Sequence, residues 1–475
     1  MKPAADPPVL EPQAAPPPAP EPRRGAVRAR MDAALGPAGG LRRRLVHAAI
    51  GSAGLKGLNM LLTSAVAIVL ARTLRPEGYG IYSFATAICA TLGVFSQVGL
   101  PTLLMREVAR MNVQERWGPM RGLLRRGNQA TILMSVLSAG GAGAWVLWAR
   151  GGSASSSEQL SALGWALFLL PLVSLGGLRS AALRGLGRVV QGQVPELLLR
   201  PLLLFLLLGG LLLLGGEGSL TPSSAMALNV AATGVAFVYG AVLLRRAIPR
   251  QVRAAAPSYD TAQWARSVVP LTILGGVQLL MAQIDILMLG ALASAEDAGV
   301  YRVVAQLGNF VMVAAVVVNA VQAPYLARFY AEGDIARLRR LAQQGSRTLF
   351  QAALVIALVL IVFGRVILDV AVGPEYVRGY VPLVIWCVGM VLTAEQGSLT
   401  TVMNMTGHER STVGAMSLGL VSNVVLNLIA IPLWGITGAA AATMFSTLLW
   451  RSLLRRETRR KLGFTIGAIG SMRER

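Results

Sequence analysis

The fold of this chain is decided by residues 70–85, which read Leu70-Ala-Arg-Thr-Leu-Arg-Pro-Glu-Gly-Tyr-Gly-Ile-Tyr-Ser-Phe-Ala85. One apolar segment ends before the Pro-Glu-Gly turn, and a second begins after it. A weaker copy runs from Leu289 to Arg302, where Gly299 stands 219 positions after Gly80 (299 − 80 = 219). A helical hairpin that occurs twice predicts a protein of two similar halves.

The composition is that of a membrane protein. Of the 475 residues, 54% are apolar and 14% are charged, whereas soluble domains carry about 25% charged residues. The net charge of +22 comes mainly from arginines at the ends of apolar segments, which is typical of topology signals and not of nucleic-acid binding. Both cysteines, Cys89 and Cys387, lie in apolar stretches, so we expect neither a disulfide nor a metal site.

Twelve apolar runs have about the 20 residues that are needed to cross a bilayer. We expect these runs to be helices, because only a helix satisfies its own backbone hydrogen bonds in lipid without a partner. These predicted spans are 49–71, 79–103, 127–149, 160–182, 192–214, 223–244, 268–291, 299–322, 348–371, 381–404, 411–433 and 436–454. Every second loop is rich in arginine, which predicts that both termini are cytoplasmic. Six spans per half give the halves the same orientation, so we expect an all-α fold of two six-helix lobes related by a parallel repeat, with a cavity between them.

Four segments follow from this reading. Residues 1–45 form a Pro/Ala/Arg-rich cytoplasmic tail that we expect to be disordered. The lobes occupy 46–250 and 251–455, and a basic cytoplasmic tail occupies 456–475. Further repeat-related positions, such as Gly187 and Gly407 (407 − 187 = 220), support the division.

Catalysis has little support. The only histidines, His47 and His408, belong to no metal-binding spacing, and the sequence lacks a G-x-x-x-x-G-K-[ST] phosphate loop. A membrane transferase would need a catalytic histidine or an acidic cluster on a loop, and neither is evident. We therefore expect no enzyme activity, cofactor or metal.

Several polar residues lie within the predicted spans, where such side chains normally face a partner or a wet cavity. Lys56 shares a helix face with Asn59 and could attract an anionic head group, or its ammonium could extend to the interface. Gln306 and Asn309 have same-face spacing, as do the amides at 423 and 427, and could bind sugar hydroxyls or join helices.

Each acidic residue within the spans could have a functional role in ion coupling or a structural role in an ion pair. Asp285 could bind a coupling cation or proton, or pair with Arg302 or Arg72 at the external rim. Glu395, in the middle of the tenth predicted span, could likewise couple an ion or form a buried pair. The spacing of Glu196 and Arg200 predicts an i,i+4 ion pair.

Several short motifs, taken together with their order along the chain, resemble those of the polysaccharide-export flippases. These proteins are the lipid-linked oligosaccharide branch of the multidrug/oligosaccharidyl-lipid/polysaccharide exporter (MOP) superfamily. The motifs are Ala71-Arg-Thr-Leu-Arg-Pro-Glu-Gly-Tyr-Gly-Ile-Tyr82, Gly99-Leu-Pro101 followed by Arg106-Glu-Val-Ala-Arg110, Gln283-Ile-Asp285 with Leu289-Gly290, Ala298-Gly-Val-Tyr301 and Asn404-Met-Thr-Gly407. The resemblance covers about residues 45–455. It implies translocation of undecaprenyl-diphosphate-linked repeat units, for surface polysaccharides such as O-antigen or exopolysaccharide, across the bacterial inner membrane by alternating access.

The resemblance also implies a cationic cavity for the diphosphate and sugar, which Lys56, Arg72 and Arg302 could serve. The expected partners are the lipid-linked glycan and membrane lipid, and the Pro-rich tail could dock a polymerase or a glycosyltransferase. Twelve spans disfavour the lipid II flippase, which usually has two more. The alternative is an ion-coupled exporter of cationic drugs, which needs acidic cavity residues such as Asp285 and Glu395.

Overall fold

The computed structural model describes residues 38–150, 157–215 and 220–468, which contain helices and no strands. Most of the predicted tail at 1–45 lies outside these residues. Residues 47–475 form one unit, to which the rest of the description applies. Its helices are α2 (Ala38–Gln97, shared with the preceding unit), α3 (Leu100–Val113), α4 (Trp117–Arg150), α5 (Ser157–Gly185), α6 (Val189–Val194), the π turn η1 (Pro195–Leu199), α7 (Arg200–Gly215), α8 (Pro222–Ala247), α9 (Arg250–Ala254), α10 (Thr261–Leu292), α11 (Ala295–Gly308), the 3-10 turn η2 (Asn309–Met312), α12 (Val313–Ala331), α13 (Ile335–Ala371), the 3-10 turn η3 (Pro374–Gly379), α14 (Tyr380–Glu395), α15 (Leu399–Met405) and α16 (Glu409–Leu462).

These helices provide the twelve predicted spans. Nine helical stretches in the described part of the chain are long and apolar enough to cross a membrane. Two of them, Gly51–Gln97 and Glu409–Leu462, contain a non-helical residue, Arg75 and Gly435 respectively, and each is therefore two spans. The 34-residue α4 supplies the twelfth span.

Two predicted spans end earlier than expected. The second stops at Gln97, because Gly99 has a left-handed φ of 64° and starts the separate amphipathic α3. The tenth stops at Glu395, and Gly397 (φ 68°) separates α14 from α15. A left-handed residue ends an α-helix, so these glycines turn two long apolar runs into a span and a shorter helix.

The predicted repeat is confirmed by the positions of equivalent elements. The second span restarts at Pro76 and α11 starts at Ala295 (295 − 76 = 219), while α6 and α16 start 220 positions apart (409 − 189 = 220). The repeat-related Gly187 and Gly407 both have left-handed φ values, 81° and 79°. The sequence repeat is therefore also a repeat of backbone conformation.

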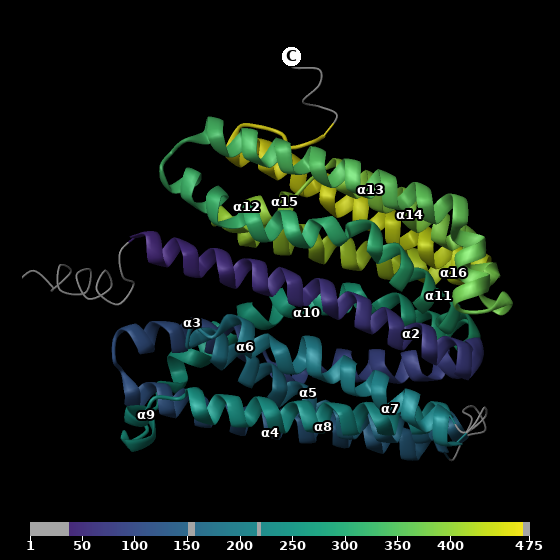
Figure 1. The fold of residues 1–475 in the computed structure, drawn as a ribbon, viewed down its shortest axis with the longest axis horizontal. Helices are drawn as coiled ribbons and strands as arrows, with labels where there is room; N and C mark the ends of the chain where they lie inside the picture. Colours follow the sequence, from purple (N-terminus) through teal and green to yellow (C-terminus); the bar gives the residue numbers. More distant parts are fainter. Residues whose placement is uncertain (1–37, 151–156, 216–219, 469–475) are drawn as a thin grey trace, which may run out of the picture. The chain divides into compact units, whose positions relative to one another are not determined.

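In each half one helix packs against several other helices of the same half. In the first half α5 lies against α3, α4 and α8, and in the second half α14 lies against α13 and α16 (Figure 1). We call the end of the bundle that holds the loops at 114–116, 248–260 and 332–334 the basic end, and the opposite end, with Arg75 and Gly435, the far end. Separate apolar clusters fill the basic end of each half.

The chain beyond α16 folds back onto the second half. Phe464 and Ile466 are buried in the apolar cluster at the basic end, and the N–H of Ala468 donates to the carbonyl of Glu395 at 2.9 Å. We call residues 464–468 the C-terminal strap.

Candidate functional site

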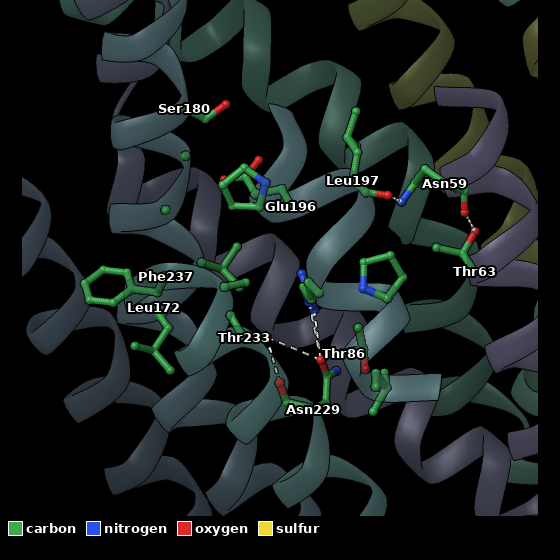
Figure 2. A pocket seen from close by; sticks show the side chains of 18 of the residues that line it. Asn59, Thr63, Thr86, Leu172, Ser180, Glu196, Leu197, Asn229, Thr233 and Phe237 are labelled. Atoms are coloured by element: carbon green, nitrogen blue, oxygen red, sulfur yellow. Dashed lines mark hydrogen bonds between the residues drawn. The ribbon is translucent and has the colours of Figure 1, made fainter. Parts of the chain in front are cut away.

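A cavity of about 600 Å³ lies in the first half and is bordered by α11 from the second. Figure 2 shows side chains of the first half that line it. Its walls come from both spans of α2, from α5, from the continuous helix α6–η1–α7 and from α8. Its polar lining consists mainly of Asn59, Thr63, Tyr79, Tyr82, Gln97, Arg179, Arg184, Glu196, Arg200, Asn229, Thr233, Arg302 and Gln306. Four arginines against one glutamate give this lining a net charge of +3 (4 − 1 = 3).

Arg200 is held in the cavity wall by neutral groups. Its Nε and Nη2 donate to Oδ1 of Asn229, at 3.4 and 3.2 Å. The Asn229 amide in turn donates to the Tyr82 hydroxyl at 2.9 Å, and the Thr233 hydroxyl donates to the Asn229 carbonyl at 2.7 Å. Because Asn229 is uncharged, the guanidinium keeps its full positive charge.

The ion pair expected between Glu196 and Arg200 is not formed in the described part of the chain. The Arg200 guanidinium instead donates to Asn229. The two residues border the π turn η1, in which the N–H of Arg200 bonds the carbonyl of Pro195, five residues back. Such π turns are frequent at functional sites.

Arg179, on α5, lies over the ring of Phe237 at 3.8 Å from its centroid. This cation–π contact fixes the guanidinium in the wall without neutralising it. Glu196 lies opposite α5, where Gly176 leaves room for its carboxylate.

The structure brings three of the six predicted substrate-binding residues into the cavity. Asn59, Arg302 and Gln306 line it, and the Gln306 amide also donates to Ser64 at 2.8 Å, which joins α11 to α2. The other three, Lys56, Arg72 and Asn309, are exposed and are not among its lining residues. The cations that sequence reasoning missed are Arg179, Arg184 and Arg200; the π turn before Arg200 is signalled only by Pro195 and Pro201.

Asp285 lies in the second half, at the centre of a buried network. Its Oδ1 accepts from Asn423 and Asn427, at 3.1 and 2.9 Å, and its Oδ2 accepts from the Tyr301 hydroxyl at 3.1 Å. The Thr443 hydroxyl is 3.2 Å from that of Tyr301. All five side chains are at least nine-tenths buried, and the carboxylate makes no described ion pair with Arg302 or Arg72.

Glu395 lies at the end of α14 and not in the middle of a span, because the helix stops there. Arg455 on α16 reaches its carboxylate at 3.3 Å. Within the described ranges, no group of three or more His, Cys, Asp or Glu side chains is arranged to hold a metal ion.

The two halves contact each other directly at the far end. The Tyr376 hydroxyl donates to the carbonyl of Ala71 at 3.0 Å, and Gly290 packs against the ring of Phe84.

Comparisons with known proteins agree with this architecture. The sequence model of the polysaccharide biosynthesis protein family matches residues 47–147, and that of the MatE family matches residues 270–429. No curated protein sequence matches the chain.

Solved structures share the fold. An inward-facing multidrug resistance MATE family transporter of the MOP superfamily superposes with a TM-score of 0.68 at 12% identity, covering 85% of this chain and 94% of that one. The lipid II flippase MurJ, in an inward closed conformation, gives 0.61 at 12% identity, covering 87% of each chain. A MOP superfamily transporter from Pyrococcus furiosus, described as having a binding pocket of reverse polarity, gives 0.59 at 14% identity, covering 88% and 95%. The chain thus matches two family models, one in each half, and shares a twelve-helix, two-lobe fold with transporters of the MOP superfamily.

Proposed function

We propose that this transporter is a flippase that moves polyprenyl-diphosphate-linked oligosaccharide repeat units across the bacterial inner membrane by alternating access. The observation that carries the proposal is the net charge of +3 on the cavity lining. Guanidinium groups bind phosphate oxygens in a bidentate manner, so a diphosphate head group is a matching ligand. Tyrosine, asparagine and threonine side chains on the same wall offer partners for sugar hydroxyls.

The far-end contacts support alternating access. The hydrogen bond from Tyr376 to Ala71 closes that end between the halves. The positive-inside rule puts the basic end in the cytoplasm, so a head group would enter from the cytoplasmic side and leave after the far end opens. In this scheme the lobes are residues 46–250 and 251–455.

We assign ion coupling to the Asp285 network. A buried carboxylate that accepts only from amides and a hydroxyl keeps an uncompensated negative charge, which a proton or a small cation would neutralise. Glu395, which already pairs with Arg455, is the weaker candidate for this role.

A liposome assay tests the function. Purified protein would be reconstituted, and transbilayer movement of a short-chain polyprenyl-diphosphate sugar would be followed. We expect movement that depends on the protein and falls when Arg200 is replaced by glutamine. Absence of movement with the wild type, when the organism's own repeat unit is supplied, would refute the proposal.

The second candidate is an exporter of cationic drugs, which the match to the MatE model at residues 270–429 favours. Excess arginine in the cavity repels such substrates, so we rank it second. Uptake of a cationic dye into the same liposomes, with no movement of the lipid-linked sugar, would reverse that order. Docking of a polymerase or glycosyltransferase on the tail at 1–45 stays a prediction.

A further inference from the structure

The sequence motif Arg106-Glu-Val-Ala-Arg110 lies on α3 and is not part of the cavity lining. Glu107 is only 5% exposed, although α3 lies at the surface. Its Oε1 is 3.3 Å from Nε of Arg106, and its Oε2 is 2.7 Å from Nη2 of Arg110. One buried carboxylate therefore holds two arginines, which are four residues apart and share the outer face of the helix.

These three side chains carry more positive charge than Glu107 needs. A buried carboxylate is costly unless it is paired, but one arginine would neutralise it, so the group has a net charge of +1 (2 − 1 = 1). The side chains of Arg106 and Arg110 stay 57% and 42% exposed. Neither has another ion-pair partner in the described part of the chain, so both present N–H groups to their surroundings.

The equivalent position in the second half lacks this arrangement. Arg328 and Glu332, at the end of α12, correspond to Arg106 and Arg110 (328 − 106 = 222 and 332 − 110 = 222). They form an exposed i,i+4 ion pair at 2.6 Å, which has no net charge. A topology signal needs positive charge at this end of the bundle but no buried carboxylate, so the arrangement on α3 calls for a further account.

The two arginines of α3 lie at the level of the lipid head groups. The second span, from Pro76 to Gln97, has 22 residues (97 − 75 = 22) and extends about 33 Å at 1.5 Å per residue, which is enough to cross the hydrocarbon core. α3 follows it at the basic end (Figure 1), and Leu104 packs against Gly127, where the apolar part of α4 begins. Residues 106–110 therefore lie just outside the hydrocarbon.

The exposed face of α3 is also partly apolar. Met105 and Val113 are 37% and 56% exposed on the same side as the two arginines. A helix face of this kind suits the boundary between head groups and acyl chains. Guanidinium groups bind phosphate in a bidentate manner. A soluble phosphate would gain nothing from the apolar side chains, whereas a phospholipid contacts both kinds.

We propose that Arg106 and Arg110, held by Glu107, bind the phosphate of an anionic phospholipid in the leaflet at the basic end. Glu107 is a positioning residue, because it fixes both guanidiniums before the lipid arrives and so reduces the side-chain entropy lost on binding. A lipid with a single negative charge matches the net charge of +1. The inference goes beyond the proposed function and does not rest on it, since the site lies outside the cavity.

Lipid titrations of the full chain in a non-ionic detergent test the site. Short-chain phosphatidylglycerol should raise the unfolding temperature, because a ligand of the folded state stabilises it. The double variant Arg106→Lys/Arg110→Lys keeps every charge but loses the bidentate geometry, so half-maximal stabilisation should need about tenfold more lipid. Arg328→Lys, at the repeat-equivalent position, is the matched control and should titrate like the wild type. Equal titrations of the double variant and the wild type would overturn the inference.

The two single variants, Arg106→Lys and Arg110→Lys, show whether both side chains hold one phosphate. If they do, either substitution alone should cause most of the loss, and the double variant should lose less than the product of the two single effects. Effects that multiply would indicate two independent charges and contradict a shared site. Every variant keeps Glu107 paired with a cation, and its unfolding temperature without lipid shows whether it is folded.

Two further probes identify the source of the phosphate. Phosphatidylcholine with the same acyl chains and inorganic phosphate should each leave the wild-type unfolding temperature nearly unchanged at concentrations at which phosphatidylglycerol raises it. Equal stabilisation by phosphatidylcholine would mean a general effect of lipid. Equal stabilisation by inorganic phosphate would mean a site for a soluble anion, and either result would exclude the proposed ligand.

Discussion

Gly80 and Gly299 contact each other at the far end, and the contact has two-fold symmetry. A Cβ atom on Gly80 would collide with the carbonyl oxygen of Ala295, and one on Gly299 would collide with that of Pro76. The repeat offset relates both pairs, since 80 + 219 = 299 and 76 + 219 = 295. The two glycines are therefore equivalent positions of the two halves, and so are the two carbonyls that they face. Neither glycine has space for a side chain.

Gly80→Ala should prevent full closure of the far end, because the added methyl group must displace backbone. In a Gln306→Cys background, labelling by a membrane-impermeant maleimide from the far side should increase several-fold. Gly54→Ala is the control, since a Cβ there meets nothing within 4 Å. Unchanged labelling in Gly80→Ala would mean that this contact is not part of the closure.

Arg200→Gln and Arg302→Gln should each reduce transport of the lipid-linked sugar by about 10-fold or more, as expected for losing a hydrogen bond to a charged ligand. Lys56→Gln should have a smaller effect, because Lys56 is exposed and does not line the cavity. Initial rates over a range of substrate concentrations would distinguish weaker binding from slower turnover. A larger effect at Lys56 than at Arg200 would move the head-group site towards the basic end.

Asp285→Asn should keep the buried network while removing its negative charge, since an amide has nearly the shape of a carboxylate. We expect a folded protein whose transport no longer responds to an imposed proton or sodium gradient. Asn427→Leu should instead destabilise the chain by roughly 1–3 kcal/mol, because it removes a donor from a buried acceptor. Transport by Asp285→Asn that still follows the gradient would exclude this carboxylate from coupling.

Ending the chain after Gly463 should lower the unfolding temperature. The truncation exposes the cluster that Phe464 and Ile466 fill, and burying a side chain of this size contributes about 1.5–3 kcal/mol. Glu457→Gln is the control, because its pairs with Arg460 and Lys461 are long at 3.9 Å and lie on the surface. Equal unfolding temperatures for the truncated and full chains would show that the strap contributes nothing to stability.

The parts of this fold that could be predicted are those that the local pattern determines. The number of spans, the orientation of the halves and the repeat follow from the lengths of the apolar runs and the spacing of the arginines. The similar φ values at Gly187 and Gly407 agree with the repeat. Partners far apart in the sequence could not be predicted in this way. The amides at 423 and 427 share a helix face, but nothing local indicates that both point at Asp285.

The sequence pattern underestimates the charge of the cavity for a related reason. The i,i+4 spacing predicts a pair of Arg200 with Glu196, whereas Arg200 bonds Asn229, which lies 29 positions later on α8. The apolar run continues past Glu395 and therefore predicts that this residue lies in the middle of a span, whereas Gly397 ends the helix. In both cases the partner of the charged side chain lies on another helix, where the local pattern does not show it.

The symmetric contact of Gly80 with Gly299 also bears on descent. An interface in which each side presents the same surface needs only one kind of subunit, so a six-helix ancestor could have formed it with a second copy of itself inserted in the same direction. Such a dimer would have carried every charged group twice. Fusion of two such copies would have let each diverge; in this chain three of the four cavity arginines lie in the first half and the buried aspartate lies in the second.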